Sequence, residues 1–173
     1  MLALNDFVIE EIMPWGLVSD RVLSETAGTF AEWFKGRAMC IQGPMRYRLR
    51  RNHGLSQYAP KKAWCCWENA QSLAQWNAPR VECWDGIVIA KRNPRGCGHG
   101  WNRIAGEWVD RTWSDGVEYH GLHVPHAHLN RIMAVKGVAS PLVWYLWAME
   151  TGLIDGPDIP FSRERYAHIG YAA

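Results

Sequence analysis

The sequence predicts a single α+β domain over residues 1–173. Apolar residues recur at helical spacing toward both ends of the chain, whereas the middle holds short segments rich in β-branched and aromatic residues. Because the strands come in one run and do not alternate with helices, the class is α+β. The 48% hydrophobic and 21% charged residues fit one folded domain and exclude a disordered or collagen-like chain.

Two helices are expected before the strands. The first covers residues 20–35, where Gly36 ends an apolar stripe formed by Leu23, Ala27, Phe30, Trp33 and Phe34. The second begins at Ala63 or Trp64 and ends at Trp76, with a stripe formed by Trp67, Ala70, Leu73 and Ala74. The Asn77-Ala78-Pro79 segment stops this second helix, because proline cannot continue it.

Three antiparallel strands are then expected over residues 81–91, 98–104 and 107–113, separated by turn residues at 93–96 and 105–106. A short extended segment follows at 119–124, and a helix at 126–136. A last helix should start with Ser140 as its N-cap and Pro141 at its first position, and should end before Gly152.

Charge and cysteine content restrict the setting of the protein. The 19 basic and 17 acidic residues leave a net charge of +2, and the N-terminus lacks the basic and apolar regions of a signal peptide. The longest apolar stretch, 141–149, is too short to cross a bilayer. We therefore expect a cytoplasmic protein with no membrane partner. Its odd number of cysteines should stay reduced there: Cys40, Cys65, Cys66, Cys83 and Cys97.

Cys66 lies in the first turn of the second expected helix. The free backbone N–H groups there favour a thiolate over a thiol, and they can also receive an oxyanion. A helix start thus supplies a nucleophile together with stabilisation of the negative charge that its attack creates. Cys65 is one residue earlier and points elsewhere on the helix surface.

A cysteine nucleophile needs a base and a group that orients the base. If Ala105-Gly106 is a two-residue hairpin turn, Trp101 faces Asp110 and His99 faces Thr112 across the two strands. His99 and Asp110 are then diagonal neighbours on one face of the sheet, about 7 Å apart by backbone and within side-chain reach. A shift of the register by one residue would place them on opposite faces.

These residues form an ordered series of short motifs. Cys-x-x-Asn-Ala (66–70) opens a helix, and Val-Glu-x-Trp (81–84), His-x-Trp (99–101), Val-Asp-x-Thr-Trp (109–113) and Tyr-x-Gly (119–121) follow on strands. This order resembles the transglutaminase-like branch of the papain-like thiol enzymes, and more narrowly small bacterial and phage proteins of that branch. The resemblance covers about residues 64–125.

The resemblance implies a transglutaminase-like fold, with the nucleophile at a helix N-terminus packed on a small antiparallel sheet. It implies Cys66 as nucleophile, His99 as base and Asp110 as the third member, with no cofactor and no metal. The expected chemistry is cleavage or transfer of acyl groups at amide bonds of a peptide or other amide substrate. Gln57 and Gln42 are candidate oxyanion donors, and Trp67, Trp101 and Trp113 are expected to wall the site.

Other functions remain open at this point. The same scaffold could be an inactive binding or accessory protein that holds a protein partner through the basic segment 46–62 or the Trp144-Tyr145-Trp147 group. That aromatic group is most simply a core stripe, and the near-neutral charge makes nucleic acid an unfavoured partner. Two zinc sites also have to be considered, one from Cys83, Cys97 and His99, and one from the histidines at positions 120, 123, 126 and 128.

Overall fold

The computed structural model describes residues 9–14, 18–49, 55, 65–130 and 141–153. Its element order is α2 (Asp20–Arg37), β1 (Met39–Gln42), α3 (Cys66–Trp76), β2 (Val81–Ala90), β3 (Asn93–Ile104), β4 (Glu107–Val109), β5 (Gly116–Val124) and α5 (Val143–Glu150). The strands form one antiparallel sheet in the order β1-β5-β2-β3-β4. The α+β class that the sequence predicts is therefore confirmed.

The expected hairpin between β3 and β4 is confirmed with its register. Ala105 and Gly106 both have positive φ angles, 49° and 84°, as a two-residue turn of this kind requires. The turn pairs Ile104 with Glu107 and Asn102 with Val109. β4 ends at Val109, four residues before the expected end, so Asp110 is the first residue after the strand.

Two other strands differ from the prediction. β3 begins at Asn93, because the Asn93–Gly96 segment continues the strand and pairs through Ala90 instead of forming a separating loop. β1 was not expected at all: four residues extend the sheet by pairing with β5. Such a short strand has too few residues to show an alternating pattern in the sequence.

The helices follow the sequence signals to different degrees, and α2 alone of α2, α3 and α5 has a side-chain cap. α2 starts after Ser19, whose hydroxyl accepts a hydrogen bond from the Val22 backbone N–H at 3.4 Å. α5 begins at Val143, later than the expected Pro141, with Leu142 at its N-cap position. Of the helix expected at 126–136, residues 126–130 are helical, and the rest falls outside the described residues.

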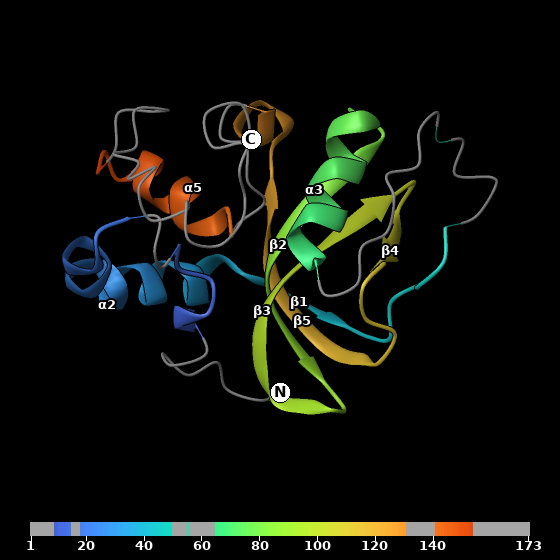
Figure 1. The fold of residues 1–173 in the computed structure, drawn as a ribbon, viewed down its shortest axis with the longest axis horizontal. Helices are drawn as coiled ribbons and strands as arrows, with labels where there is room; N and C mark the ends of the chain where they lie inside the picture. The colour runs from blue at the N-terminus through green and yellow to red at the C-terminus, as the bar shows by residue number, and fades with distance from the viewer. Residues whose placement is uncertain (1–8, 15–17, 50–54, 56–64, 131–140, 154–173) are drawn as a thin grey trace, which may run out of the picture.

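The sheet has two different faces. Figure 1 shows α2 and α5 together at one side and α3 lying along β2 and β3. We call the face of the sheet that carries Gly98 and Gly100, which contact α3, the helix face. The opposite face, which carries Trp84, Trp101 and Tyr119, is called the site face.

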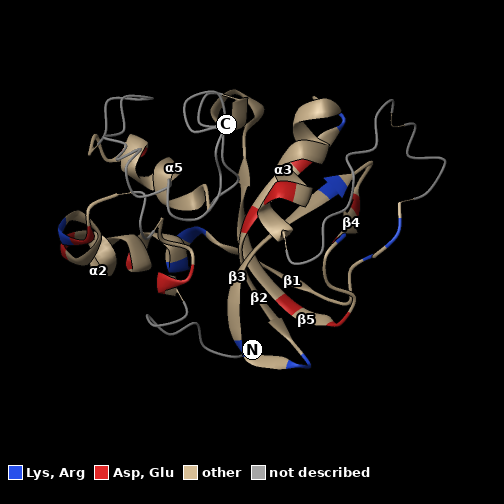
Figure 2. Ribbon diagram, viewed as in Figure 1, with Lys and Arg blue, Asp and Glu red and all other residues tan. Residues whose placement is uncertain are grey.

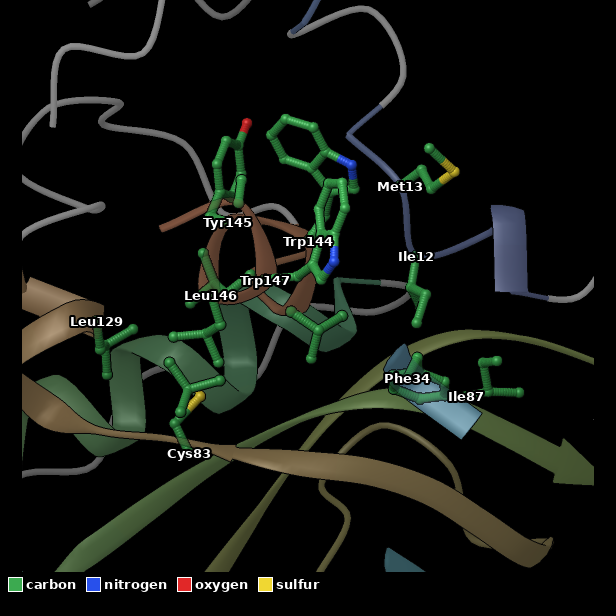
Figure 3. Close-up of a cluster of buried hydrophobic side chains, with 14 of the residues drawn as sticks. Ile12, Met13, Phe34, Cys83, Ile87, Leu129, Trp144, Tyr145, Leu146 and Trp147 are labelled. Atoms are coloured by element: carbon green, nitrogen blue, oxygen red, sulfur yellow. The ribbon is translucent and has the colours of Figure 1, made fainter. Parts of the chain in front are cut away.

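The larger apolar core lies on the helix face. Figure 3 shows α5 residues directed toward side chains from α2 and the sheet, including Phe34, Cys83 and Ile87. Trp144 and Tyr145 have no exposed surface and Trp147 has 5%. The aromatic group of α5 is therefore a core stripe, and its use as an exposed docking surface is excluded.

The charged residues of the described segments are mixed in sign (Figure 2). Arg46, from the basic segment, has its Nε 2.9 Å from Oε2 of Glu107 on β4. Most of that basic segment falls in the part of the chain outside the description. No helix among the described residues has the length and apolar character needed to cross a membrane.

Candidate active site

The structure brings His99 and Asp110 into direct contact. Nε2 of His99 is 2.7 Å from Oδ2 of Asp110, and neither side chain has exposed surface. The hairpin register causes this contact, because it places both residues on the site face, His99 in the middle of β3 and Asp110 just after β4. A buried charged group needs such a partner to offset its loss of hydration.

The Asp110 carboxylate accepts four hydrogen bonds. Oδ1 receives the backbone N–H groups of Thr112 and Trp113 at 2.8 and 3.0 Å, and Oδ2 receives the Tyr119 hydroxyl at 2.9 Å in addition to His99. Burial acts to raise the pKa of Asp110, but the His99 charge and these hydrogen bonds outweigh it and hold the pKa below its ordinary value. The group is thus a fixed carboxylate with all its acceptor positions used.

Tyr119 is a member of this arrangement whose role was not identified from the sequence. It lies on β5, the strand on the far side of β2 from β3, and its hydroxyl is directed at Asp110. The Tyr-x-Gly motif had marked the residue but not its partner. Gly116 provides the room, since a Cβ there would lie 2.1 Å from the Tyr119 hydroxyl oxygen.

His99 is held in its charged form. Burial alone would lower its pKa, but the Asp110 carboxylate, with a smaller contribution from Cys66, raises the pKa of His99 from 6.5 to about 10. The imidazolium is therefore favoured at neutral pH. Its second ring nitrogen, Nδ1, is buried and has no hydrogen-bond partner among the described residues.

Cys66 is the first residue of α3 and Cys65 is its N-cap, so the helix starts two or three residues later than expected and Cys66 still lies in its first turn. The Cys66 Sγ lies 4.0 Å from the carbonyl oxygen of Gly98, the residue before His99, and close enough to the imidazole to affect its charge. No hydrogen bond of normal geometry joins the thiol to Nδ1, although Cys66 is near enough to contribute to the raised pKa of His99. Cys66 is partly buried, whereas His99 is fully enclosed.

Two of the three tryptophans expected to wall the site do so. Trp101 stacks beside His99 at a centroid distance of 6.3 Å and an angle of 20°, and Trp113 lies 5.4 Å from it at 45°. Trp67 does not share this position, because its indole lies on the helix face against Gly98 and Gly100. There it supports the β3 backbone that carries His99.

The buried Asp85 connects α3, the helix that begins at Cys66, to the rest of the fold. Its Oδ1 accepts a hydrogen bond from Trp67 Nε1 at 2.9 Å, and its Oδ2 accepts one from the backbone N–H of Leu142 at the start of α5. Burial outweighs these hydrogen bonds and raises the pKa of Asp85 from 3.8 to about 7. The residue next to Cys66 is thus fixed by a carboxyl group that the sequence did not single out.

Of the two expected oxyanion donors, Gln57 lies outside the described residues. The other, Gln42, is not at the site: its amide donates to Glu118 Oε2 at 3.3 Å on the helix face, away from Tyr119 and Asp110. A backbone donor is close to the thiol, the N–H of Cys66 itself, which has no partner within the helix because it belongs to the first turn.

The two zinc sites considered from the sequence do not form. Cys83 is buried in the core of the helix face, while His99 points to the site face and is bound to Asp110. Of the clustered histidines, His120 pairs with Glu118, and His123 lies against Trp84. In the part of the chain that the structure describes, neither set gathers its donor atoms around one point.

The chain was compared with known families and proteins. No family model, no curated protein and no solved structure matches it. The resemblance to the transglutaminase-like branch therefore rests on the order of the sequence motifs.

Proposed function

We propose that the protein is a thiol enzyme that cleaves or transfers acyl groups at amide bonds, with Cys66 as nucleophile, His99 as acid and base, and Asp110 as the orienting group. One observation carries the proposal. A fully buried imidazole is held through Nε2 by a carboxylate at 2.7 Å, while its Nδ1 has no hydrogen-bond partner among the described residues and lies near a thiol at a helix start.

In this proposal the attacking group is the Cys66 sulfur in its thiolate form, beside the imidazolium of His99. Asp110 keeps the proton on Nε2, so the second proton of His99 sits on Nδ1, the nitrogen on the Cys66 side. The Cys66 sulfur then attacks the substrate carbonyl carbon, and the carbonyl π electrons move to the oxygen. The backbone N–H of Cys66 donates to this oxyanion, which the helix start also stabilises.

The intermediate collapses when the C–N bond breaks. The leaving amine takes the proton from Nδ1 of His99, which leaves a thioester on Cys66 and a neutral imidazole. Water or a second amine then gives its proton to Nδ1 and attacks the thioester. The acid or new amide departs, and the thiolate and imidazolium are restored.

The preferred substrate is a peptide or another amide. Trp101 and Trp113 lie against His99 and keep water from its ring, which strengthens the interaction with Asp110. Because His99 and Asp110 are enclosed, the substrate reaches the site from the side of the partly exposed Cys66.

Acylation by p-nitrophenyl acetate tests the proposal. A thiol enzyme of this kind should release nitrophenolate in a burst of one equivalent and carry an acetyl group on Cys66, located by peptide mass spectrometry. His99→Ala should abolish the burst. Cys65→Ser is the matched control, since it removes the neighbouring thiol and should leave the burst intact.

Two results would contradict the proposal. Acetylation of Cys65 in place of Cys66 would show that Cys66 is not the nucleophile. The absence of any burst in the folded wild-type protein would favour the alternative, an inactive binding or accessory protein on this scaffold.

A further inference from the structure

A second group of chemically reactive side chains lies at the edge of the sheet formed by β1 and β5. Cys40, Glu118 and His120 each direct one donor atom to a common point, and the three atoms lie within 4.8 Å of one another. Glu118 and His120 are buried, and Cys40 is partly buried. The amide nitrogen of Gln42 lies beside them, 3.5 Å from Cys40 Sγ.

The strand pairing explains why these side chains meet. Cys40 is the direct partner of His120 across the β1–β5 ladder, and Glu118 is two residues before His120 on β5. All three therefore share the helix face, while Tyr119 between them points to the site face. The arrangement comes from two strands distant in sequence.

From this geometry we infer that Cys40, Glu118 and His120 form a binding site for a divalent transition metal ion, with Zn²⁺ as the best match. Zinc accepts the thiolate sulfur, imidazole nitrogen and carboxylate oxygen that these residues offer. Alkaline-earth ions, which prefer all-oxygen sites, would be poorly held.

The distances are close to those that a metal needs. Bond lengths of about 2.0–2.3 Å place tetrahedral ligand atoms about 3.3–3.6 Å apart, and the three donor atoms lie within 4.8 Å of one another, so shifts of about 1 Å would form the site. Rotation of the partly buried Cys40 side chain can bring its sulfur closer. Nε2 of His120 and Oε1 of Glu118 lie 2.6 Å apart and would separate by less than about 1 Å as the metal takes the place of the proton between them.

Three protein ligands leave one coordination position for water or an external ligand. The ion would also tie β1 to β5. It would therefore stabilise the strand that carries Tyr119, and through Tyr119 the Asp110 carboxylate.

The test uses the full chain with Cys66→Ala, so that the active-site thiol and His99 cannot bind the metal together. Equilibrium dialysis with ZnCl₂ should show one bound equivalent. CoCl₂ should give the intense visible bands of a tetrahedral site and a thiolate-to-cobalt charge-transfer band. Zinc should also raise the melting temperature, because it binds the folded chain.

Variants assign the ligands. Cys40→Ser in the same background should remove the charge-transfer band and weaken zinc binding by at least about tenfold. Tenfold is a lower limit, because even the loss of a residue that only supports a ligand weakens metal binding by that much. Cys97→Ser, which alters another partly buried thiol, should leave both unchanged. His120→Gln supplies a second ligand variant, and near-ultraviolet circular dichroism checks that each variant is folded.

Either of two results would overturn the site. One is the absence of stoichiometric zinc and of tetrahedral cobalt bands in the folded Cys66→Ala protein. The other is binding that Cys40→Ser leaves undiminished, which would locate the metal elsewhere. Neither result bears on acylation of Cys66, so the site and the proposed thiol chemistry stand or fall separately.

Discussion

Asp110→Asn tests the link between the carboxylate and the charge of His99. The side-chain oxygens of Asp110 face four donors, two backbone N–H groups at Oδ1 and the His99 and Tyr119 protons at Oδ2. The carboxamide of asparagine has one oxygen and one NH₂ group. Its NH₂ group therefore takes the place of one carboxylate oxygen and faces two hydrogen-bond donors that it cannot accept from. With the oxygen retained by the two backbone groups, the NH₂ faces Nε2 of His99.

His99 must then accept at Nε2 and become neutral, with its proton on Nδ1. In the wild type, Asp110 is the main reason that the pKa of His99 rises from 6.5 to about 10, which corresponds to roughly 5 kcal/mol at about 1.4 kcal/mol per pH unit. Without that charge, burial lowers the pKa of His99 and is opposed only by the smaller contribution of Cys66. The base that should hold the thiol proton is lost.

The assay is alkylation of Cys66 by iodoacetamide in mildly acidic buffer, followed by peptide mass spectrometry. Wild-type Cys66 should react much faster than the other four cysteines, and Asp110→Asn should slow it by about 100-fold or more, the usual contribution of a positioned base. The exposed Asp20 on α2 provides the control, since Asp20→Asn removes one carboxylate far from the site. Unchanged Cys66 reactivity in folded Asp110→Asn would refute the reasoning and leave Asp110 a structural residue.

Further predictions concern stability, measured by urea unfolding. Tyr119→Phe removes the hydroxyl that donates to Asp110 and should lower the free energy of unfolding by about 1.5–3 kcal/mol. Cys66 alkylation should also become slower, because Asp110 loses one of its hydrogen bonds. An unchanged alkylation rate would show that Tyr119 contributes to stability alone. Gly121→Ala should lower the free energy of unfolding by about 3 kcal/mol or more, because its Cβ would lie 2.4 Å from Trp101 and 2.7 Å from a backbone oxygen. Gly28→Ala is the control: Gly28 is an exposed position of α2, its Cβ would meet no atom within 4 Å, and the change should stabilise the fold by about 0.5–1 kcal/mol. Equal effects of the two variants would contradict the packing described around Gly121. Because the pKa of Asp85 is raised to about 7, the folded state retains a proton that the unfolded chain loses near 3.8, so stability should fall as pH rises from about 4 to about 7. Asp85→Asn should abolish that slope, and a slope that persists would assign it to another group.

The sequence could predict the features that depend on local signals. Ala105-Gly106 defines a two-residue turn, and the turn fixes the register that joins His99 to Asp110. The helical pattern also placed Cys66 in the first turn of α3 and the helix end at Trp76, although the start was expected two or three residues earlier.

The remaining features depend on contacts between distant segments. Tyr119 reaches Asp110 only because β5 lies next to β2, and no local pattern states that order. Gln42 was named only as a candidate oxyanion donor, because β1 is too short for its sequence to reveal the strand that directs this side chain to Glu118. The role of Asp85 could not be predicted, because its hydrogen-bond partners are distant in sequence: Trp67 lies on α3 and Leu142 directly precedes α5.

The hydrogen bonds of Asp85 also limit how far the protein can be shortened. A fragment that ends at residue 130 would retain all five strands and the Cys66 helix, yet it would lack the Leu142 backbone N–H that Asp85 accepts from. The Asp85 carboxyl group would lose this hydrogen bond, and the apolar surface that packs against Trp144 would become exposed to water. The smallest fragment that folds by itself should therefore extend through Glu150. A protease cut ahead of α5 should unfold the whole domain, including the region around Cys66.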